Sequence, residues 1–148
     1  MRSAVVIDYG VVNLKNILRG FEYVGAQVES STDPDRVLKA DRVILPGVGA
    51  FESGMNELQA LGMDEAVKFV VRAGRPVLGI CLGMQMLFDK SSEYGLHEGL
   101  GLIPGSVVPI PTEQEGVRRR KIPHIGWNSL YKPDEARSWK GSCLNNTR

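Results

Sequence analysis

The chain has 148 residues, 43% of them hydrophobic, with 18 basic and 17 acidic side chains and a net charge of +1. This length and apolar content predict one globular domain, and the balanced charge gives no indication of a nucleic-acid partner or a membrane surface. Two cysteines do not make a disulfide framework, and no stretch approaches the roughly 18 apolar residues of a membrane span. We therefore expect a cytoplasmic protein, and we predict no metal or cofactor site.

Strand-like and helix-like segments alternate from the N-terminus. β-branched runs predict buried strands, and apolar residues at helical spacing predict helices. Asn13 is the expected N-cap of the first helix, and Gly25 is expected just past its end. Pro34 is suited to the first position of the second helix. The predicted strands are 4–8, 27–31, 41–51, which runs into a Pro-Gly-x-Gly loop, and 75–81; the predicted helices are 13–25, 33–40, 51–62, 64–74 and 82–92.

This alternation is typical of an α/β fold, here a flavodoxin-like parallel sheet flanked by helices. From Gly95 the chain changes to glycine- and proline-punctuated β segments, which we expect to form hairpins at a sheet edge. The segment 132–148 has no clear period. We therefore predict one domain over 1–131, followed by a poorly ordered tail over 132–148.

Cys81 lies in Gly79-Ile80-Cys81-Leu82-Gly83, where the fourth predicted strand meets the next helix. A glycine two residues to either side of a nucleophile is the pattern of a strand–turn–helix elbow. We expect it at the carboxyl end of a central strand, with the helix N-terminus favouring the thiolate. The N–H of Leu82 would donate to the oxygen of an attacked carbonyl, and the loop 46–49 would offer a second donor. The alternative is a buried structural cysteine.

Four sequence blocks give the elbow a family context: DYGVVNL (8–14), LPGVGAF (45–51), GICLGMQMLF (79–88) and PHIGWN (123–128). With these blocks the chain resembles class I (triad) glutamine amidotransferases, most closely the glutaminase subunits of imidazole glycerol phosphate synthases in histidine biosynthesis. The resemblance implies the amidotransferase fold, L-glutamine as substrate and a cyclase subunit resembling a (βα)8 barrel as partner. It implies no cofactor.

The resemblance also implies roles for individual residues. Cys81 would be the nucleophile that takes the γ-glutamyl group. Gln85 and Glu93 would hold the α-amino and α-carboxylate ends of glutamine, although Glu93 is equally well explained as a solvated loop acid. Asn13 and Trp127 would lie near the partner subunit, although an N-cap and a partly buried aromatic explain them too. The implied oxyanion donors are on Gly47, Val48, Gly49 and Leu82.

The chain departs from the family pattern in two places. Val12 stands where the family has glycine, and a turn that needs positive φ would not suit valine. The family's base and orienting acid belong to a closing His-x-Glu stretch, which these 148 residues lack, so we expect a C-terminally incomplete fold. The chain has only two histidines: His97, interpreted as a solvated loop residue, and His124, at a structural or interface position.

Three hypotheses remain open. The first is a glutaminase that delivers ammonia to a synthase partner, inactive or weak in this form because no base is visible. The second is a non-catalytic relative that keeps the fold and the partner surface. The third is a different cysteine hydrolase of the same fold, which the leucine directly after Cys81 disfavours, since one related pattern places a histidine there.

Overall fold

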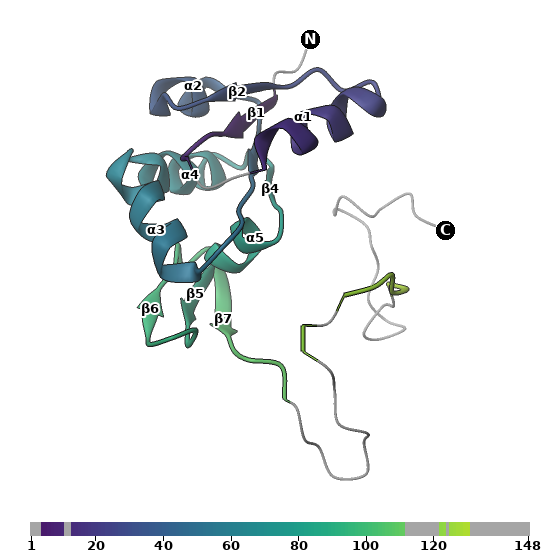
Figure 1. Cartoon of the computed structure of the whole chain (residues 1–148). Helices are drawn as coiled ribbons and strands as arrows, with labels where there is room; N and C mark the ends of the chain where they lie inside the picture. The colour runs from purple at the N-terminus through teal and green to yellow at the C-terminus, as the bar shows by residue number, and fades with distance from the viewer. Residues whose placement is uncertain (1–3, 11–12, 112–121, 124, 131–148) are drawn as a thin grey trace, which may run out of the picture. The chain divides into compact units, whose positions relative to one another are not determined.

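A computed structural model of the chain describes residues 4–10, 13–111, 122–123 and 125–130. Figure 1 shows the helices and strands in order along the chain. The strands are β1 (Ala4–Ile7), β2 (Glu29–Ser31), β3 (Arg42–Leu45), β4 (Val77–Gly79), β5 (Phe88–Ser91), β6 (His97–Glu98) and β7 (Ile103–Val107). The helices are α1 (Leu14–Tyr23), α2 (Pro34–Lys39), α3 (Phe51–Ala60), α4 (Met63–Arg72) and α5 (Leu82–Met86). None of the helices in these ranges is long and apolar enough to cross a membrane.

Strands β1 to β4 form the predicted parallel sheet, in the order β2-β1-β3-β4. Both central strands, β1 and β3, end in three consecutive buried residues, which explains why their sequences are continuous apolar runs. Strand β4 is an edge strand of this sheet, so the prediction that Cys81 follows a central strand is wrong for the described residues. The sequence identified the strand correctly but contained no signal for its place in the sheet.

The main core covers one face of the sheet. Val5 and Ile7 of β1 and Val43 and Leu45 of β3 point to this face, because side chains alternate along a strand. They pack against apolar side chains of three helices: Val37 of α2, Phe51, Met55 and Leu58 of α3, and Met63, Ala66, Val67 and Val70 of α4. All these side chains are buried, and they form one apolar cluster.

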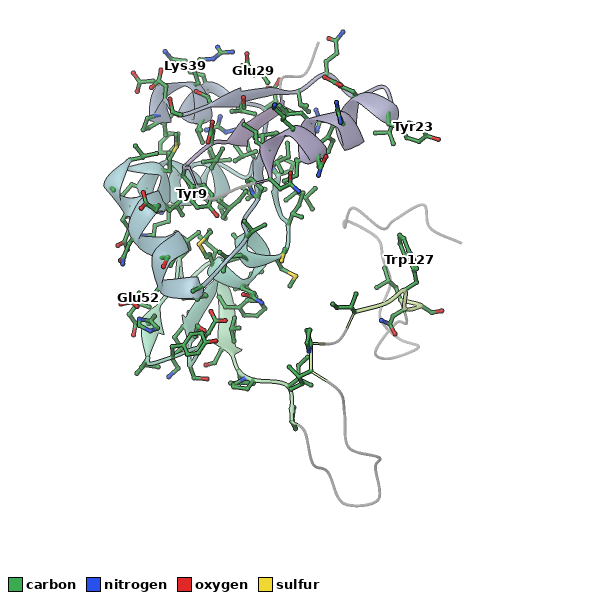
Figure 2. The ribbon with its side chains drawn as sticks, in the orientation of Figure 1. Tyr9, Tyr23, Glu29, Lys39, Glu52 and Trp127 are labelled. Carbon is green, nitrogen blue, oxygen red and sulfur yellow. The ribbon has the colours of Figure 1, made fainter. Side chains whose placement is uncertain are left out.

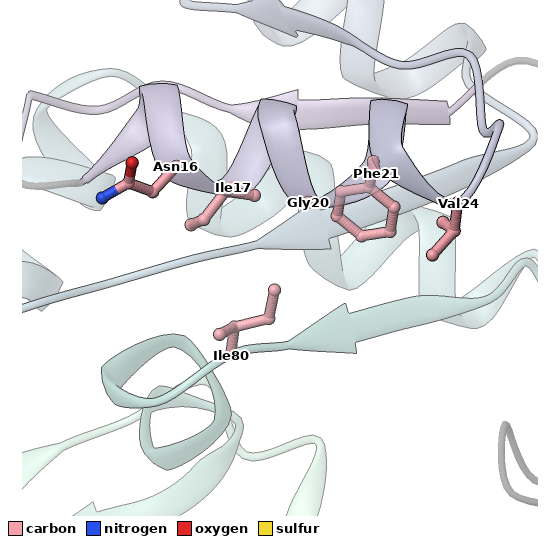
Figure 3. A pocket seen from close by; sticks show the side chains of 6 residues that line it. All are labelled: Asn16, Ile17, Gly20, Phe21, Val24 and Ile80. Carbon is pink, nitrogen blue, oxygen red and sulfur yellow. The ribbon is translucent and has the colours of Figure 1, made fainter.

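The opposite face carries α1 and is covered less completely. Ile44 of β3 is paired with Leu78 of β4, so both side chains point to this face, and Leu78 is 39% exposed. No residue of α1 is buried, although the helix is strongly amphipathic. An open apolar groove of about 300 Å³ separates α1 from the residue after β4 (Figure 3). Its lining is Asn16, Ile17, Gly20, Phe21, Val24 and Ile80.

The predicted helix ends are largely confirmed. Gly25 has φ +74°, its N–H donates to Glu22 and the N–H of Ala26 donates to Phe21, which is a Schellman ending of α1. Asn13 occupies the N-cap position of α1, but its side chain makes no capping hydrogen bond.

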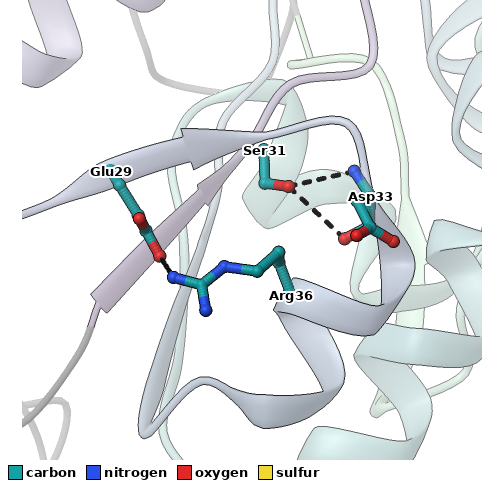
Figure 4. Close-up of polar contacts among 4 residues, drawn as sticks. All are labelled: Glu29, Ser31, Asp33 and Arg36. Carbon is teal, nitrogen blue, oxygen red and sulfur yellow. Dashed lines mark hydrogen bonds and ion pairs between the residues drawn. The ribbon is translucent and has the colours of Figure 1, made fainter.

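The start of α2 also follows the prediction, with Pro34 at its first position. The carboxylate of Asp33 caps the helix by accepting from the N–H of Asp35 at 2.9 Å. The N–H of Asp33 in turn donates to Ser31 Oγ at 3.0 Å, and Arg36 pairs with Glu29 (Figure 4).

The predicted helix over 82–92 is too long. Helix α5 ends at Met86, and β5 starts at Phe88. The carbonyl of Met86 accepts from the N–H of Leu100, and the carbonyl of Leu87 accepts from the N–H groups of Leu102 and Ile103. These bonds to a distant segment take the acceptors that a longer helix would use.

Strand β5 belongs to a second sheet, with the order β6-β5-β7. The prediction of β structure after Gly95 is confirmed in β6 and β7. The expected hairpins are found only in part, because β5 pairs antiparallel with the next strand, β6, but parallel with β7, in a sheet separate from that of β1 to β4. A parallel pair needs a longer connection than a hairpin, and the glycine and proline pattern alone did not reveal it.

The chain divides into two compact units, Met1–Pro109 and Ile110–Arg148. The described part of the second unit contains no helix or strand. The prediction of a domain over 1–131 stays a prediction, because the proposed tail over 132–148 lies outside the described residues.

Candidate active site

Cys81 lies between β4 and α5 in a backbone conformation that few residues with a side chain adopt. Its φ is 55° and its ψ is −117°, it is the N-cap residue of α5, and it is exposed. A non-glycine residue in such a region carries strain of about 1–3 kcal/mol and is found mainly at functional sites. The conformation agrees with a nucleophile elbow and disagrees with a buried structural cysteine. Because α5 has only five residues, its dipole gives the thiolate less support than the sequence suggested.

Gly83 allows the elbow to lie directly against β3. A Cβ on Gly83 would overlap the carbonyl oxygen of Leu45, so no residue with a side chain fits there. The N–H of Ile80 donates to the same carbonyl at 2.9 Å. The elbow motif therefore has glycine at its second glycine position, Gly83, because the start of α5 contacts the end of β3 too closely for a side chain.

The proposed oxyanion loop follows β3 and contacts the elbow. A Cβ on Gly47 would lie 2.9 Å from both the N atom of Gly83 and the Cβ of Leu82. Gly47 is buried, whereas Val48 and Gly49 are exposed, and Gly49 has φ +100°. The structure thus brings Gly47 and Leu82 together next to Cys81, as the resemblance implied.

Tyr9 is a residue of this site to which the sequence assigned no role. It follows β1 within the DYG block, is 2% exposed, and donates from its hydroxyl to the carbonyl oxygen of Pro46 at 2.8 Å (labelled in Figure 2). Burial raises the pKa of Tyr9, and the nearby Cys81 raises it further. The parallel pairing of β1 with β3 explains this contact, because it places the carboxyl ends of the two strands side by side.

Gln85 and Glu93, the proposed substrate ligands, are both partly buried. Gln85 is on α5, where its N–H donates to the carbonyl of Cys81 at 3.1 Å. Glu93 Oε2 accepts from the backbone N–H of Phe51 at 2.7 Å, and the N–H of Glu93 donates to the buried Ser91 Oγ at 3.1 Å. Glu93 therefore binds the first residue of α3 and is not a freely solvated loop acid.

His97 differs from its interpretation as a solvated loop residue. It lies in β6, its side chain is 18% exposed, and its Nε2 is buried without a hydrogen-bond partner among the described residues. Nδ1 is 3.7 Å from Glu52 Oε1, at a pocket of about 240 Å³ on one side of α3. The other lining residues are Met55, Asn56, Gln59, Leu96 and Glu98. Cys81 does not line this pocket, so the structure gives no support for His97 as its base.

The two proposed interface residues belong to different units. Asn13 is exposed at the start of α1, and Trp127 is fully exposed in the second unit. Val12, His124 and Cys143 lie outside the described residues, so the predictions about them stay predictions. Within the described ranges, no three His, Cys, Asp or Glu residues are grouped in a way that would hold a metal ion.

Comparison with solved structures supports the fold. A crystal structure of a glutamine amidotransferase matches 70% of this chain and 55% of its own, with a TM-score of 0.61 and 17% identity. A protein described as a peptidase E from Listeria monocytogenes EGD-e matches 69% of this chain and 63% of its own, with a TM-score of 0.57 and 16% identity. At these identities the likeness concerns the fold alone, and it confirms the predicted class of parallel α/β sheet.

Sequence comparison is more specific. The family model for class-I glutamine amidotransferases matches residues 5–147. The imidazole glycerol phosphate synthase subunit HisH 1 of Legionella pneumophila (strain Lens) is 49% identical over 99% of this chain and 68% of its own length. The HisH subunit of Geobacter metallireducens is 48% identical over 88% of this chain and 62% of its own length. The chain therefore spans about two thirds of the length of these relatives, and it belongs to the class-I glutamine amidotransferase family, within the group of HisH subunits of imidazole glycerol phosphate synthase.

Proposed function

We propose that this chain is a glutaminase subunit that binds L-glutamine, transfers its γ-glutamyl group to Cys81 and releases ammonia for a synthase partner, with weak turnover in the form of these 148 residues. The observation that carries the proposal is the exposed, strained elbow at Cys81, in contact with the loop that contains Gly47. A thiolate there would attack the γ-carbonyl carbon, forming a C–S bond. The oxygen would take up negative charge and accept from the N–H of Leu82 and from one N–H of Gly47, Val48 or Gly49.

The rest of the cycle needs a proton carrier. The departing ammonia must receive a proton, and a water must lose one as it attacks the thioester to release glutamate. Gln85 and Glu93 would bind the α-amino and α-carboxylate groups of the substrate. Glu93 has one carboxylate oxygen bound to the N–H of Phe51, so its other oxygen would contact the substrate ammonium.

The proposed partner is a cyclase subunit resembling a (βα)8 barrel, and the proposed assembly is a cytoplasmic heterodimer acting in histidine biosynthesis. Relatives at 49% and 48% identity are named as subunits of imidazole glycerol phosphate synthase, which supports a partner of this kind. Asn13 and Trp127 are the proposed contact residues, and both side chains are exposed.

A second candidate function is partner binding without turnover. It is favoured by the position of His97, which lies in a pocket that Cys81 does not line. Loss of a triad base can lower kcat by a factor on the order of 10⁶. We therefore expect glutaminase turnover by these 148 residues to be near background, even with the partner present.

The test is a steady-state ammonia assay with and without a cyclase partner, with Cys81→Ala as the control. The expected result is background turnover, together with slow formation of a Cys81 adduct when a glutamine-analogue electrophile is supplied. Turnover at the rate of a full-length relative would contradict the expectation of weak activity. Its loss in His97→Ala or His124→Ala would identify a working base, and partner binding without any Cys81 adduct would favour the second candidate.

A further inference from the structure

The hydroxyl of Tyr9 is packed into the contact between the oxyanion loop and the elbow. Its donation to the Pro46 carbonyl joins the end of β1 to the first residue after β3. A Cβ on Gly47 would stand 2.6 Å from the Tyr9 hydroxyl oxygen, in addition to its contacts with Leu82 and Gly83. The phenol, the Pro46–Gly47 peptide and the start of α5 thus fit together without room for one further methyl group.

This hydrogen bond constrains a donor group of the loop. In a trans peptide the carbonyl and the N–H point in opposite directions, so a fixed Pro46 carbonyl also fixes the direction of the Gly47 N–H. The Tyr9 phenol is protonated and able to donate throughout the neutral range, and burial moves its pKa further from that range. Without the hydroxyl, the buried Pro46 carbonyl would lose a partner, and rotation of this peptide would become easier.

We propose that Tyr9 is a positioning residue that holds the loop at Pro46 and Gly47 in the orientation needed for acyl transfer to Cys81. The inference rests on the proposed glutaminase function. It goes beyond that function, because Tyr9 acts through the loop and does not touch the substrate. A purely structural role for Tyr9 would lower stability without a selective effect on attack at a carbonyl.

Two reactions of the Cys81 thiol distinguish a positioning role of Tyr9 from a purely structural role. Acylation by the 4-nitrophenyl γ-ester of L-glutamate forms a C–S bond, places negative charge on the carbonyl oxygen, and then breaks the C–O bond to release nitrophenolate. Alkylation by iodoacetamide forms a C–S bond and expels iodide, without an oxyanion. Neither reaction needs a proton carrier once the thiol is ionised, so both can be measured on the 148-residue chain at constant pH.

The variant is Tyr9→Phe, which removes one oxygen atom, and the control is Tyr23→Phe, which alters a 92% exposed side chain. Peptide mass spectrometry follows Cys81, with Cys143 as an internal reference. We expect Tyr9→Phe to slow acylation of Cys81 by about tenfold or more, with the factor of about 10²–10³ for complete loss of an oxyanion donor as the upper bound, because the variant misdirects the donor and does not remove it. Alkylation of Cys81 should be unchanged, and Tyr23→Phe should match the wild type in both reactions.

Three outcomes would overturn the proposal. Equal acylation of Tyr9→Phe and wild type would remove the positioning role and leave the glutaminase proposal intact. An equal decrease in acylation and alkylation would assign Tyr9 a general structural role. A wild-type Cys81 that is alkylated but acylated no faster than Cys143 would contradict the glutaminase proposal itself, and the positioning role with it.

Discussion

Glu93 and Phe51, which are 42 residues apart in the chain, are joined by a 2.7 Å hydrogen bond from the Phe51 N–H to the Glu93 carboxylate. The bond satisfies a free N–H at the start of α3, where negative charge is also favoured by the helix dipole. Phe51 directly follows the loop of Gly49 and Ala50, so a residue proposed to bind glutamine also anchors the segment proposed to stabilise its oxyanion.

We therefore predict that Glu93→Ala destabilises the fold as well as impairing substrate binding. A hydrogen bond to a charged group contributes about 1.5–3 kcal/mol, and Glu93→Gln, which keeps an acceptor, should lose less of it. Urea unfolding followed by circular dichroism measures the difference. The control is Glu57→Ala, at an exposed position of α3, the helix whose first residue Glu93 binds; this variant should change stability little. Identical midpoints for Glu93→Ala and Glu57→Ala would show that the bond makes no net contribution.

Tyr9 makes the stability of the fold depend on pH in the alkaline range. Burial raises the pKa of Tyr9 in the folded state above the value near 10 of an unfolded tyrosine, so folding favours the protonated phenol. The stabilisation that the protonated phenol gives to the folded state is fully present below about pH 10. It is lost as the pH rises from there towards the pKa of Tyr9 in the folded state. The wild type should therefore lose stability more steeply than Tyr9→Phe between about pH 9.5 and 11. Unfolding midpoints across this range are the measurement, and parallel curves for the two proteins would contradict the prediction.

Arg75 connects the end of α2 to the residues between α4 and β4. Its guanidinium donates to the carbonyls of Leu38 at 2.8 Å and Ala40 at 2.6 Å, and it lies 5.7 Å from the centre of the Phe69 ring. We expect Arg75→Ala to cost about 1.5–3 kcal/mol, the range of hydrogen bonds from a charged donor, and Arg75→Lys to cost less.

The matched control for this prediction is Arg72→Ala. Arg72 is exposed and has a 3.8 Å ion pair with Glu65, a kind of contact that contributes little because water screens both charges. Thermal or urea unfolding of the three variants orders their stabilities. A cost for Arg72→Ala equal to that for Arg75→Ala would show that the two carbonyl contacts add nothing.

Helices α1 and α4 should differ in local stability. Met63, Ala66, Val67 and Val70 of α4 are buried, whereas α1 has no buried residue and borders the open groove next to Ile80. Helices with few buried contacts open locally at a low free energy. Amide hydrogen exchange at neutral pH should therefore be much faster in α1 than in α4. Equal protection of the two helices would indicate that the groove face is anchored more firmly than its burial suggests.

The sequence predicted those features that depend on local pattern. The runs around Val6 and Ile44 identified buried parallel strands, and Asp33 with Pro34 identified the start of α2, because each signal lies within a few adjacent residues. The elbow at Cys81 was also predicted, since its glycines stand at fixed offsets.

Features that depend on contacts between distant residues were missed or misjudged. The end of α5 at Met86 is set by an N–H group of Leu100, and the environment of His97 is set by Glu52 of α3. The hydrogen bond of Tyr9 to Pro46 likewise spans 37 residues and leaves no periodic trace in the sequence. Such contacts follow from the pairing of strands and the packing of helices, which the sequence did not specify in detail.

The backbone of Cys81, at φ 55° and ψ −117°, sets stability and chemistry against each other. Glycine would adopt these angles at lower energy, so Cys81→Gly should raise the melting temperature while removing the thiol. Selection for robustness alone would thus favour glycine at position 81. A stabilised variant that still carries the cysteine must gain its stability elsewhere in the molecule, because relief of this strain and retention of the nucleophile exclude one another.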